Sequence, residues 1–290
     1  MAATAAEPDA KRRRLGWLRP PEMSPDGSMA LVDHLREIRY RVTVSAIFVV
    51  LASIGAAFFY RELVEFILWP YYTAKEQVRQ SNPGAQFLLT NDGVIAPFTL
   101  AVIASLMAGV MISSPFWLYQ LWAFVAPGLV AKEKRYALGF IGSAAPLFIL
   151  GCALGYWVWP KGIAVMLSFT PKDMDITNLL EMTKFLSLEI KLILVFGLSF
   201  LLPVVLVALN LAGVLHAHHL ASSRRFVIFG TFVFAAIATP STDPFSMLAL
   251  ALPMTVLYFI AELICRVIDK KRGVTAESVA EFAIDVDDGK

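Results

Sequence analysis

The sequence has few charged residues and few cysteines for its length. Only 17% of its 290 residues are Asp, Glu, Lys or Arg, whereas 58% are hydrophobic and the mean hydropathy is +0.66. Soluble domains contain roughly 45 to 50% apolar residues on a similar residue set. Several runs of about 20 residues lack charge, and each could cross a hydrocarbon core of ~30 Å as a helix. These features exclude a soluble enzyme domain and indicate a membrane protein with several spans.

The chain also lacks the motifs that bind metals, phosphates or cofactors. Its two cysteines, Cys152 and Cys265, give neither a disulfide framework nor a metal-type spacing. It has no phosphate-binding glycine loop, no paired zinc-ligand motif and no DDxxD run. Three histidines, His216, His218 and His219, lie in one loop, and we interpret them as a solvated stretch rather than a metal site. We therefore expect no cofactor, no metal and no enzymatic activity.

Six apolar runs predict an all-α integral membrane protein. The predicted spans are residues 42–59, 94–121, 137–159, 185–209, 226–238 and 245–265. Pro115 should bend the second span. The fifth run has thirteen residues and reaches only ~20 Å as a helix, so helices five and six are expected to be short. The predicted domains are a disordered basic tail at 1–28, a six-helix transmembrane domain at 29–268 and a second tail at 269–290.

The distribution of Lys and Arg predicts the orientation. Eighteen of the 25 lie in the two terminal segments and the second and fourth loops, whereas the alternate loops contain six. Cytoplasmic segments carry the excess of basic residues, so both termini are expected to be cytoplasmic. Residues 15–28 are polar and interrupted by proline, so the preceding basic cluster does not read as a cleaved signal peptide.

Two acidic residues lie in basic segments where a helix is expected to enter the membrane. Glu37 lies between Arg36 and Arg39, and Glu133 lies among the charges of residues 132–135. Each could form a local ion pair, which is common and weak. Together they could also bind guanidinium groups through bidentate hydrogen bonds. The sequence leaves both interpretations open.

Two charged residues lie inside the fourth predicted span, where charge is costly and often functional. Glu189 and Lys191 are about 200° apart around a helix, so they are poor partners for each other. They either line a functional site or extend along the helix to the outer interface.

The sequence resembles the TatC family, the polytopic subunit of the twin-arginine protein translocase. The resemblance covers most of residues 30–270. It rests on the motifs HLREIRYR (34–41), APF (96–98), SPFWLYQLWAFVAPGL (114–129), KEKR (132–135), FGLSFLLPV (196–204) and ATPSTDPFSM (238–247).

The resemblance implies a cup-shaped bundle in the cytoplasmic membrane of a prokaryote. It implies a receptor that recognises the Arg-Arg pair of signal peptides on folded proteins, through residues that match Glu37 and Glu133. Further matches to the cytoplasmic motifs are Arg39, Phe124, Pro127 and Arg135. Matches to outer positions that serve shape or assembly are Pro70, Phe98 and Asp243. The implied partners are single-span subunits of the TatA and TatB type, other copies of the receptor and the lipid bilayer, with the proton-motive force as energy source and no nucleic acid.

One position departs from the family pattern. The family often has a glutamate in the middle of span four, where this chain has Leu201. Glu189 lies twelve residues earlier, about 18 Å along a helix and about 120° around it, so it cannot simply substitute. We hypothesise that a polar contact to a partner helix has moved outward to Glu189, or that the partner supplies it.

The alternative class is a secondary transporter or channel for a small solute, with Glu189 and Lys191 along its path. No inverted repeat relates the two halves, and no span has a midplane polar cluster of the transporter kind. The sequence therefore favours the receptor.

Overall fold

The structure, a computed structural model, is almost entirely helical in the residues that it describes. These are residues 31–81, 86–91, 93–125, 133–170, 177–211, 213–239 and 244–273. The predicted disordered tail at 1–28 and most of the second tail lie outside them. The helices are α2 (Leu31–Ala57), α3 (Tyr60–Ser81), α4 (Ala96–Ile112), α5 (Ser114–Val125), α6 (Glu133–Ser168), α7 (Met182–Ser199), α8 (Leu202–Leu211), α9 (Ala217–Ala238) and α10 (Pro244–Arg272).

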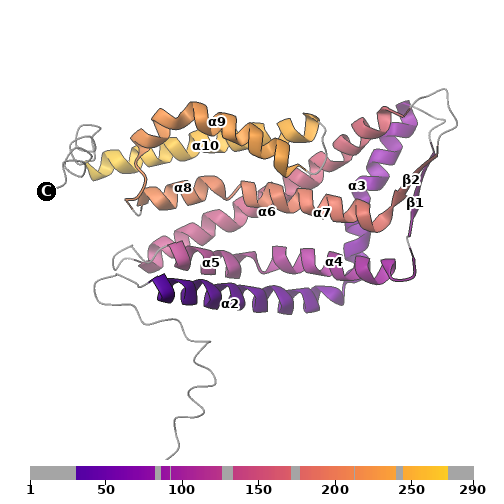
Figure 1. The fold of residues 1–290 in the computed structure, drawn as a ribbon, viewed down its shortest axis with the longest axis horizontal. Helices are drawn as coiled ribbons and strands as arrows, with labels where there is room; N and C mark the ends of the chain where they lie inside the picture. Colours follow the sequence, from indigo (N-terminus) through magenta and orange to yellow (C-terminus); the bar gives the residue numbers. More distant parts are fainter. Residues whose placement is uncertain are drawn as a thin grey trace, which may run out of the picture.

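The helices form a bundle, and most of their axes lie roughly along the long axis of the molecule (Figure 1). Among the described residues, five helical segments are long and apolar enough to cross a membrane, and the bent pair α4–α5, taken as one span, makes a sixth. The prediction of a six-span helical membrane protein is confirmed. The start of α2, the starts of α6 and α9 and the end of α10 lie at the same end of the molecule (Figure 1). We call this the basic end, because it contains Arg36, Arg39, Arg41, Arg224, Arg225, Arg266, Lys270, Lys271 and Arg272.

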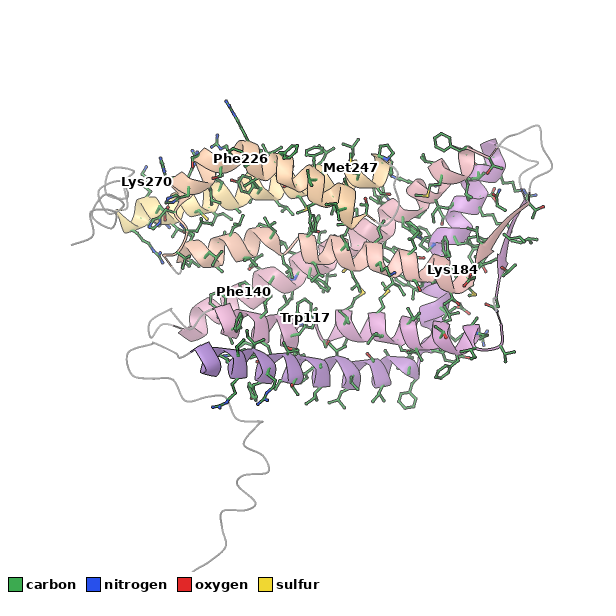
Figure 2. The ribbon with its side chains drawn as sticks, viewed as in Figure 1. Trp117, Phe140, Lys184, Phe226, Met247 and Lys270 are labelled. Carbon is green, nitrogen blue, oxygen red and sulfur yellow. The ribbon has the colours of Figure 1, made fainter. Side chains whose placement is uncertain are left out.

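The second span bends where the sequence predicts it. The axes of α4 and α5 differ by 59° at the break that precedes Pro115. Trp117 Nε1 donates a hydrogen bond of 3.0 Å to the carbonyl oxygen of Val110 on the other side of the break. The Trp117 indole lies between α5 and α6, with its ring centroid 5.2 Å from that of Phe148 (Figure 2). The bend is therefore fixed both by the proline and by a side chain that satisfies the backbone.

Several helices are longer than their apolar runs. The apolar run at 226–238 is continued toward the basic end by residues 217–225, so α9 has 22 residues. Likewise α10 has 29 residues and extends past the predicted end into Lys270 and Arg272. The expectation that helices five and six are short is therefore wrong for the helices, and only the apolar run of the fifth is short. No glycine or proline interrupts these polar extensions, so nothing stops the helix at the edge of the apolar run.

The first and third segments between the predicted spans, residues 60–93 and 160–184, contain regular structure. Residues 60–81 form α3, an amphipathic helix that contains Pro70. The strands β1 (Gln86–Thr90) and β2 (Thr177–Glu181) pair in parallel, with Gln86 opposite Thr177. The strands lie at the end of the molecule opposite the basic end (Figure 1). This pairing joins the segment after α3 to the segment before α7.

Close packing of α6 on α7 lies at the centre of the core. A Cβ atom added to Gly151 of α6 would lie 2.6 Å from the carbonyl oxygen of Phe196 and 2.9 Å from the Cα atom of Gly197, both in α7. Gly155, one turn further along α6, also faces Phe196 closely. Small residues four apart let membrane helices approach until their backbones touch. The hydrophobic core is built on this contact and includes Phe148, Leu192 and Phe196.

We expect Gly151→Ala to lower the melting temperature of the purified protein in detergent. The new methyl group would contact backbone atoms that cannot rotate away, so overpacking should cost about 1 to 3 kcal/mol. Gly142→Ala is the matched control in the same helix, because its Cβ would meet nothing within 4 Å. If both variants melt with the wild type, α6 and α7 are not as close as described.

Candidate functional site

The candidate site lies at the basic end and is centred on the carboxylate of Glu37. Glu37 is 2% exposed, although it lies near the start of the first span. Arg41 Nε and Nη2 both donate to Glu37 Oε1, at 2.8 and 2.5 Å. Glu37 Oε2 is buried and accepts no hydrogen bond from the residues that the structure describes. The carboxylate therefore has one oxygen that Arg41 neutralises and one that is buried without a donor among the described residues.

Helix geometry produces the ion pair. Glu37 and Arg41 are four residues apart in α2, so their side chains lie on the same face. Arg41 also reaches across to α5, where its Nη1 lies 3.4 Å from Gln120 Oε1. Phe48, about two turns beyond Arg41 in α2, stacks on Phe116 of α5 with ring centroids 4.7 Å apart. The basic end of α2 is thus fixed against α5 by a polar contact and an aromatic contact.

An apolar groove of about 570 Å³ begins at this ion pair. It runs between α2 and α5, and Leu198 of α7 closes one side. The residues that line it are Ile38, Arg41, Val42, Ser45, Ala46, Val49, Val110, Trp117, Gln120, Leu121, Phe124 and Leu198. Arg41 and Gln120 supply the polar groups, and nearly all the other lining residues are apolar. A ligand that combines a cation with an apolar segment fits this arrangement.

The structure places the predicted cytoplasmic residues unevenly. Phe124 lines the groove, and Arg39 is exposed on α2. Glu133 begins α6 at the basic end, but its side chain and that of Arg135 lie outside what the structure describes, as does Pro127. The structure therefore places Phe124 in a groove that Arg41, the partner of Glu37, also lines, and it shows Glu133 by its backbone alone.

The outer residues lie far from this site. Pro70 is buried in the middle of α3, and Phe98 is 71% exposed in the first turn of α4. Asp243 lies outside the described residues. A buried proline and an exposed aromatic residue are consistent with positions that determine shape or contact, and neither has catalytic geometry.

Glu189 lies inside the bundle and not at an interface. Its side chain is 0% exposed, whereas Lys191 is exposed, so the two are not partners and only the lysine extends toward the surroundings. The interpretation that both extend to the outer interface is wrong for Glu189. Neither carboxylate oxygen forms a well-aligned hydrogen bond with the described residues, and the donor that interacts with it, the buried Trp159 Nε1, forms none either. A helix packed on the outside of the bundle cannot reach this carboxylate.

Sequence reasoning missed two polar clusters at the basic end. Asp269 of α10 accepts hydrogen bonds from Asn210 Nδ2 at 2.8 Å and from the backbone N–H of Ala217 at 2.7 Å, which joins three helices. Glu262 of α10 pairs with Arg224 and Arg266. The spacing of Glu262 and Arg266, four apart in one helix, was the only available signal. The described residues contain no group of three His, Cys, Asp or Glu side chains that could hold a metal, so His216, His218 and His219 form no such site.

The fold and the site define a polytopic helical membrane protein with a buried ion pair and an apolar groove at one end. Residues 33–253 match the family model described as Sec-independent protein translocase protein (TatC). The TatC protein of Frankia casuarinae is 38% identical, over 82% of this chain and 66% of that protein. The TatC protein of Xylanimonas cellulosilytica is 36% identical, over 80% of this chain and 81% of that protein.

The solved structures agree with the sequences. A crystal structure of the twin arginine translocase receptor TatC superposes with a TM-score of 0.64 at 31% identity, covering 81% of this chain and 98% of that chain. A second crystal structure of the receptor, in the detergent DDM, gives a TM-score of 0.65 at 32% identity, covering 80% and 99%. The chain belongs to the TatC family.

We expect Arg41→Gln to destabilise the protein, because it leaves the buried Glu37 carboxylate without its positive partner. Breaking a buried ion pair from one side costs about 3 kcal/mol. The double variant Glu37→Gln/Arg41→Gln should recover most of the loss, since no buried charge remains. Thermal unfolding in detergent measures both. An Arg41→Gln variant as stable as the wild type would show that the pair is solvated.

We expect Glu189→Met to raise the melting temperature. A buried polar group without a partner costs about 1 to 3 kcal/mol, and methionine has a similar length without that cost. Glu262→Met is the control, because Glu262 is equally buried but holds two arginines, and its replacement should lower the melting temperature. If Glu189→Met melts below the wild type, the carboxyl group has a partner that the packing does not reveal.

Proposed function

We propose that this protein is the receptor of a twin-arginine translocase and binds the Arg-Arg motif of signal peptides on folded proteins. The observation that supports this most directly is the buried Glu37 carboxylate, with one oxygen unpartnered, next to an apolar groove. Guanidinium groups are the cations best suited to a carboxylate in such a place, because their planar fork can donate two hydrogen bonds to one oxygen, as Arg41 does to Oε1. The protein acts by binding and not as an enzyme.

The groove would hold the apolar stretch of the signal peptide. Such a stretch follows the arginine pair in a signal peptide, and the groove follows Glu37 along α2. A peptide that places its arginine at Glu37 would therefore lay its apolar residues against Val42, Ala46 and Leu121. The ion pair and the groove together select for both parts of the signal.

Arg41 would hold one oxygen of the Glu37 carboxylate both before and after a signal peptide binds. It already binds Glu37 Oε1 with two nitrogens, in the manner of an incoming arginine. An arginine of the signal would bind Oε2, so the carboxylate would hold two guanidinium groups. Glu133 would provide the second carboxylate for the second arginine, with Arg39, Phe124, Pro127 and Arg135 around the peptide.

The remaining parts of the proposal concern assembly and orientation. The exposed apolar faces of α9 and α10 would contact single-span partners of the TatA and TatB type, and further copies of the receptor would complete the complex. Pro70, Phe98 and Asp243 would maintain the outer surface, and the proton-motive force would drive transport. Both termini would be cytoplasmic, in the inner membrane of a prokaryote, because the described basic residues gather at the end of the molecule where α2 starts and α10 ends.

The test is binding of a fluorescent twin-arginine signal peptide to the purified protein, alongside a peptide with Lys-Lys in place of Arg-Arg. Lysine keeps the charge but loses the planar fork, so it isolates bidentate recognition. We expect at least tenfold weaker binding for the Lys-Lys peptide and for the Glu37→Gln/Glu133→Gln variant, since a charge-assisted hydrogen bond is worth about 1.5 to 3 kcal/mol.

Glu65→Gln is the control, because Glu65 is an exposed glutamate in α3 that also pairs with an arginine four residues away. It should bind the peptide as the wild type does. Equal binding of both peptides to all variants would mean that only apolar affinity is present. Uptake of a labelled small solute by liposomes containing the protein would then favour the transporter class.

A further inference from the structure

A second basic cluster lies at the basic end, on α9 and α10, and the proposed signal site does not use it. Its centre is the carboxylate of Glu262, whose side chain is 3% exposed. Arg224 donates from Nε to Glu262 Oε2 at 2.8 Å and from Nη2 to Glu262 Oε1 at 2.6 Å. Arg266 Nη2 also lies 2.6 Å from Glu262 Oε1. One buried carboxylate thus fixes two guanidinium groups, and the cluster keeps a net positive charge.

A third arginine adds to this charge without a partner. Arg225 is exposed and forms no ion pair with any residue that the structure describes. The other acidic side chain nearby on α10, Asp269, is buried and is occupied by Asn210 and by the backbone N–H of Ala217. No further described carboxylate therefore neutralises the cluster.

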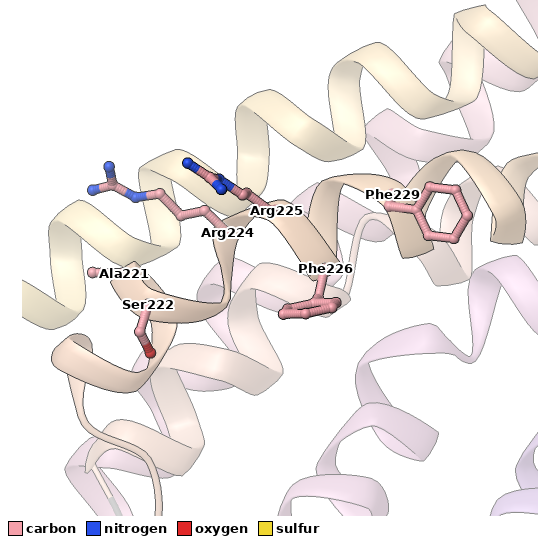
Figure 3. A pocket seen from close by; sticks show the side chains of 6 residues that line it. All are labelled: Ala221, Ser222, Arg224, Arg225, Phe226 and Phe229. Atoms are coloured by element: carbon pink, nitrogen blue, oxygen red, sulfur yellow. The ribbon is translucent and has the colours of Figure 1, made fainter.

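The arginines border a hollow of about 790 Å³ on the surface of α9. Its lining residues are Ala221, Ser222, Arg224, Arg225, Phe226 and Phe229. Figure 3 shows the guanidinium groups of Arg224 and Arg225 near each other, with the rings of Phe226 and Phe229 farther along the helix. Ser222, Phe226 and Phe229 are four and three residues apart, so they share a face of α9. The hollow is basic at one end and aromatic at the other.

We propose that this hollow binds the headgroup of an anionic phospholipid. The phosphate would accept hydrogen bonds from Arg225 and from the free Nη1 atom of Arg224, which Glu262 holds in place. The acyl chains would pass over Phe226 and Phe229, which are 81% and 70% exposed. Basic pockets at the ends of membrane helices bind anionic headgroups through this combination of charge and apolar surface.

The position of the hollow favours a lipid over a free anion or a peptide. It lies where the polar turn of α9 meets the apolar run of a helix long enough to span a membrane. Headgroup phosphates occupy this depth of a bilayer, and exposed aromatic rings are favoured there. A soluble anion would gain nothing from Phe229, whereas a lipid would gain from both ends of the hollow.

Native mass spectrometry of the full chain in neutral detergent can test this proposal. The probes are dioleoylphosphatidylglycerol, dioleoylphosphatidylcholine and inorganic phosphate as a competitor. We expect the wild type to bind the first phosphatidylglycerol about fivefold or more tightly than phosphatidylcholine, and millimolar phosphate not to displace it. Arg225→Gln should reduce that preference about fivefold, the effect of one basic residue near an anionic surface. Phe229→Ser should weaken binding of the same lipid.

Lys271→Gln is the matched control, because Lys271 is an exposed cation at the same end that does not line the hollow. It should retain the lipid preference within twofold. Equal losses for Arg225→Gln and Lys271→Gln would overturn the proposal in favour of diffuse electrostatic attraction. Displacement by phosphate, with no effect of Phe229→Ser, would overturn it in favour of a free-anion site. Neither variant changes Glu37 or the groove, so these results are independent of signal-peptide binding.

Discussion

The carboxylate of Glu37 is buried at the end of a membrane helix, where an unpaired charge is costly. Arg41 neutralises it from the same helix, and Gln120 ties that arginine to the neighbouring helix. The contact is asymmetric, because both Arg41 nitrogens use one carboxylate oxygen and leave the other without a donor. The proposed recognition of arginine depends on this asymmetry. A carboxylate with hydrogen-bond donors on both oxygens would gain little from binding a second guanidinium group.

The rest of the fold holds the groove next to this carboxylate. The 59° bend between α4 and α5 turns α5 along α2, and the Trp117 indole fixes the bend by bonding to Val110. Gly109 allows a second close approach, since an added Cβ there would collide with Ser53 of α2. At the opposite end, the β1–β2 pair joins two loops that are distant in sequence. The groove is thus shaped by helix breaks and glycine contacts, and the charged residues are placed upon that frame.

Much of this architecture could be predicted from hydropathy, because the bilayer requires long apolar helices. The bend at Pro115 was predictable because proline has no backbone N–H and cannot continue the hydrogen bonds of a helix. The parallel pairing of β1 with β2 was not, since the strands are far apart in the chain and too short to show a pattern. The amphipathic α3 was not predicted as a helix, because its charged residues obscure the apolar face in the hydropathy pattern.

The site residues show a similar division. Glu37 is identifiable from its position, but its ion-pair partner is Arg41 and not Arg36 or Arg39. The spacing of four residues between Glu37 and Arg41 would have indicated this pair. Glu189 was identified from its charge, but whether it faced a partner or the core depended on the rotation of α7, which the sequence does not determine. Arg224 was counted only as a loop charge, because its carboxylate partner Glu262 lies on a different helix. Arg266 was counted only as a charge of the terminal segment, although it lies four residues from Glu262 in α10.

Direct contact between Glu37 and a signal-peptide arginine is the central claim. Solid-state NMR on the protein in lipid bilayers can measure it, with ¹³C in the Glu37 carboxylate and ¹⁵N in the guanidinium groups of the bound peptide alone. A charge-assisted hydrogen bond of about 2.8 Å between nitrogen and oxygen puts these nuclei within about 4 Å. We predict strong dipolar dephasing of the Glu37 signal by the peptide. Saturating peptide without any dephasing would contradict the account and leave Glu37 as a structural partner of Arg41.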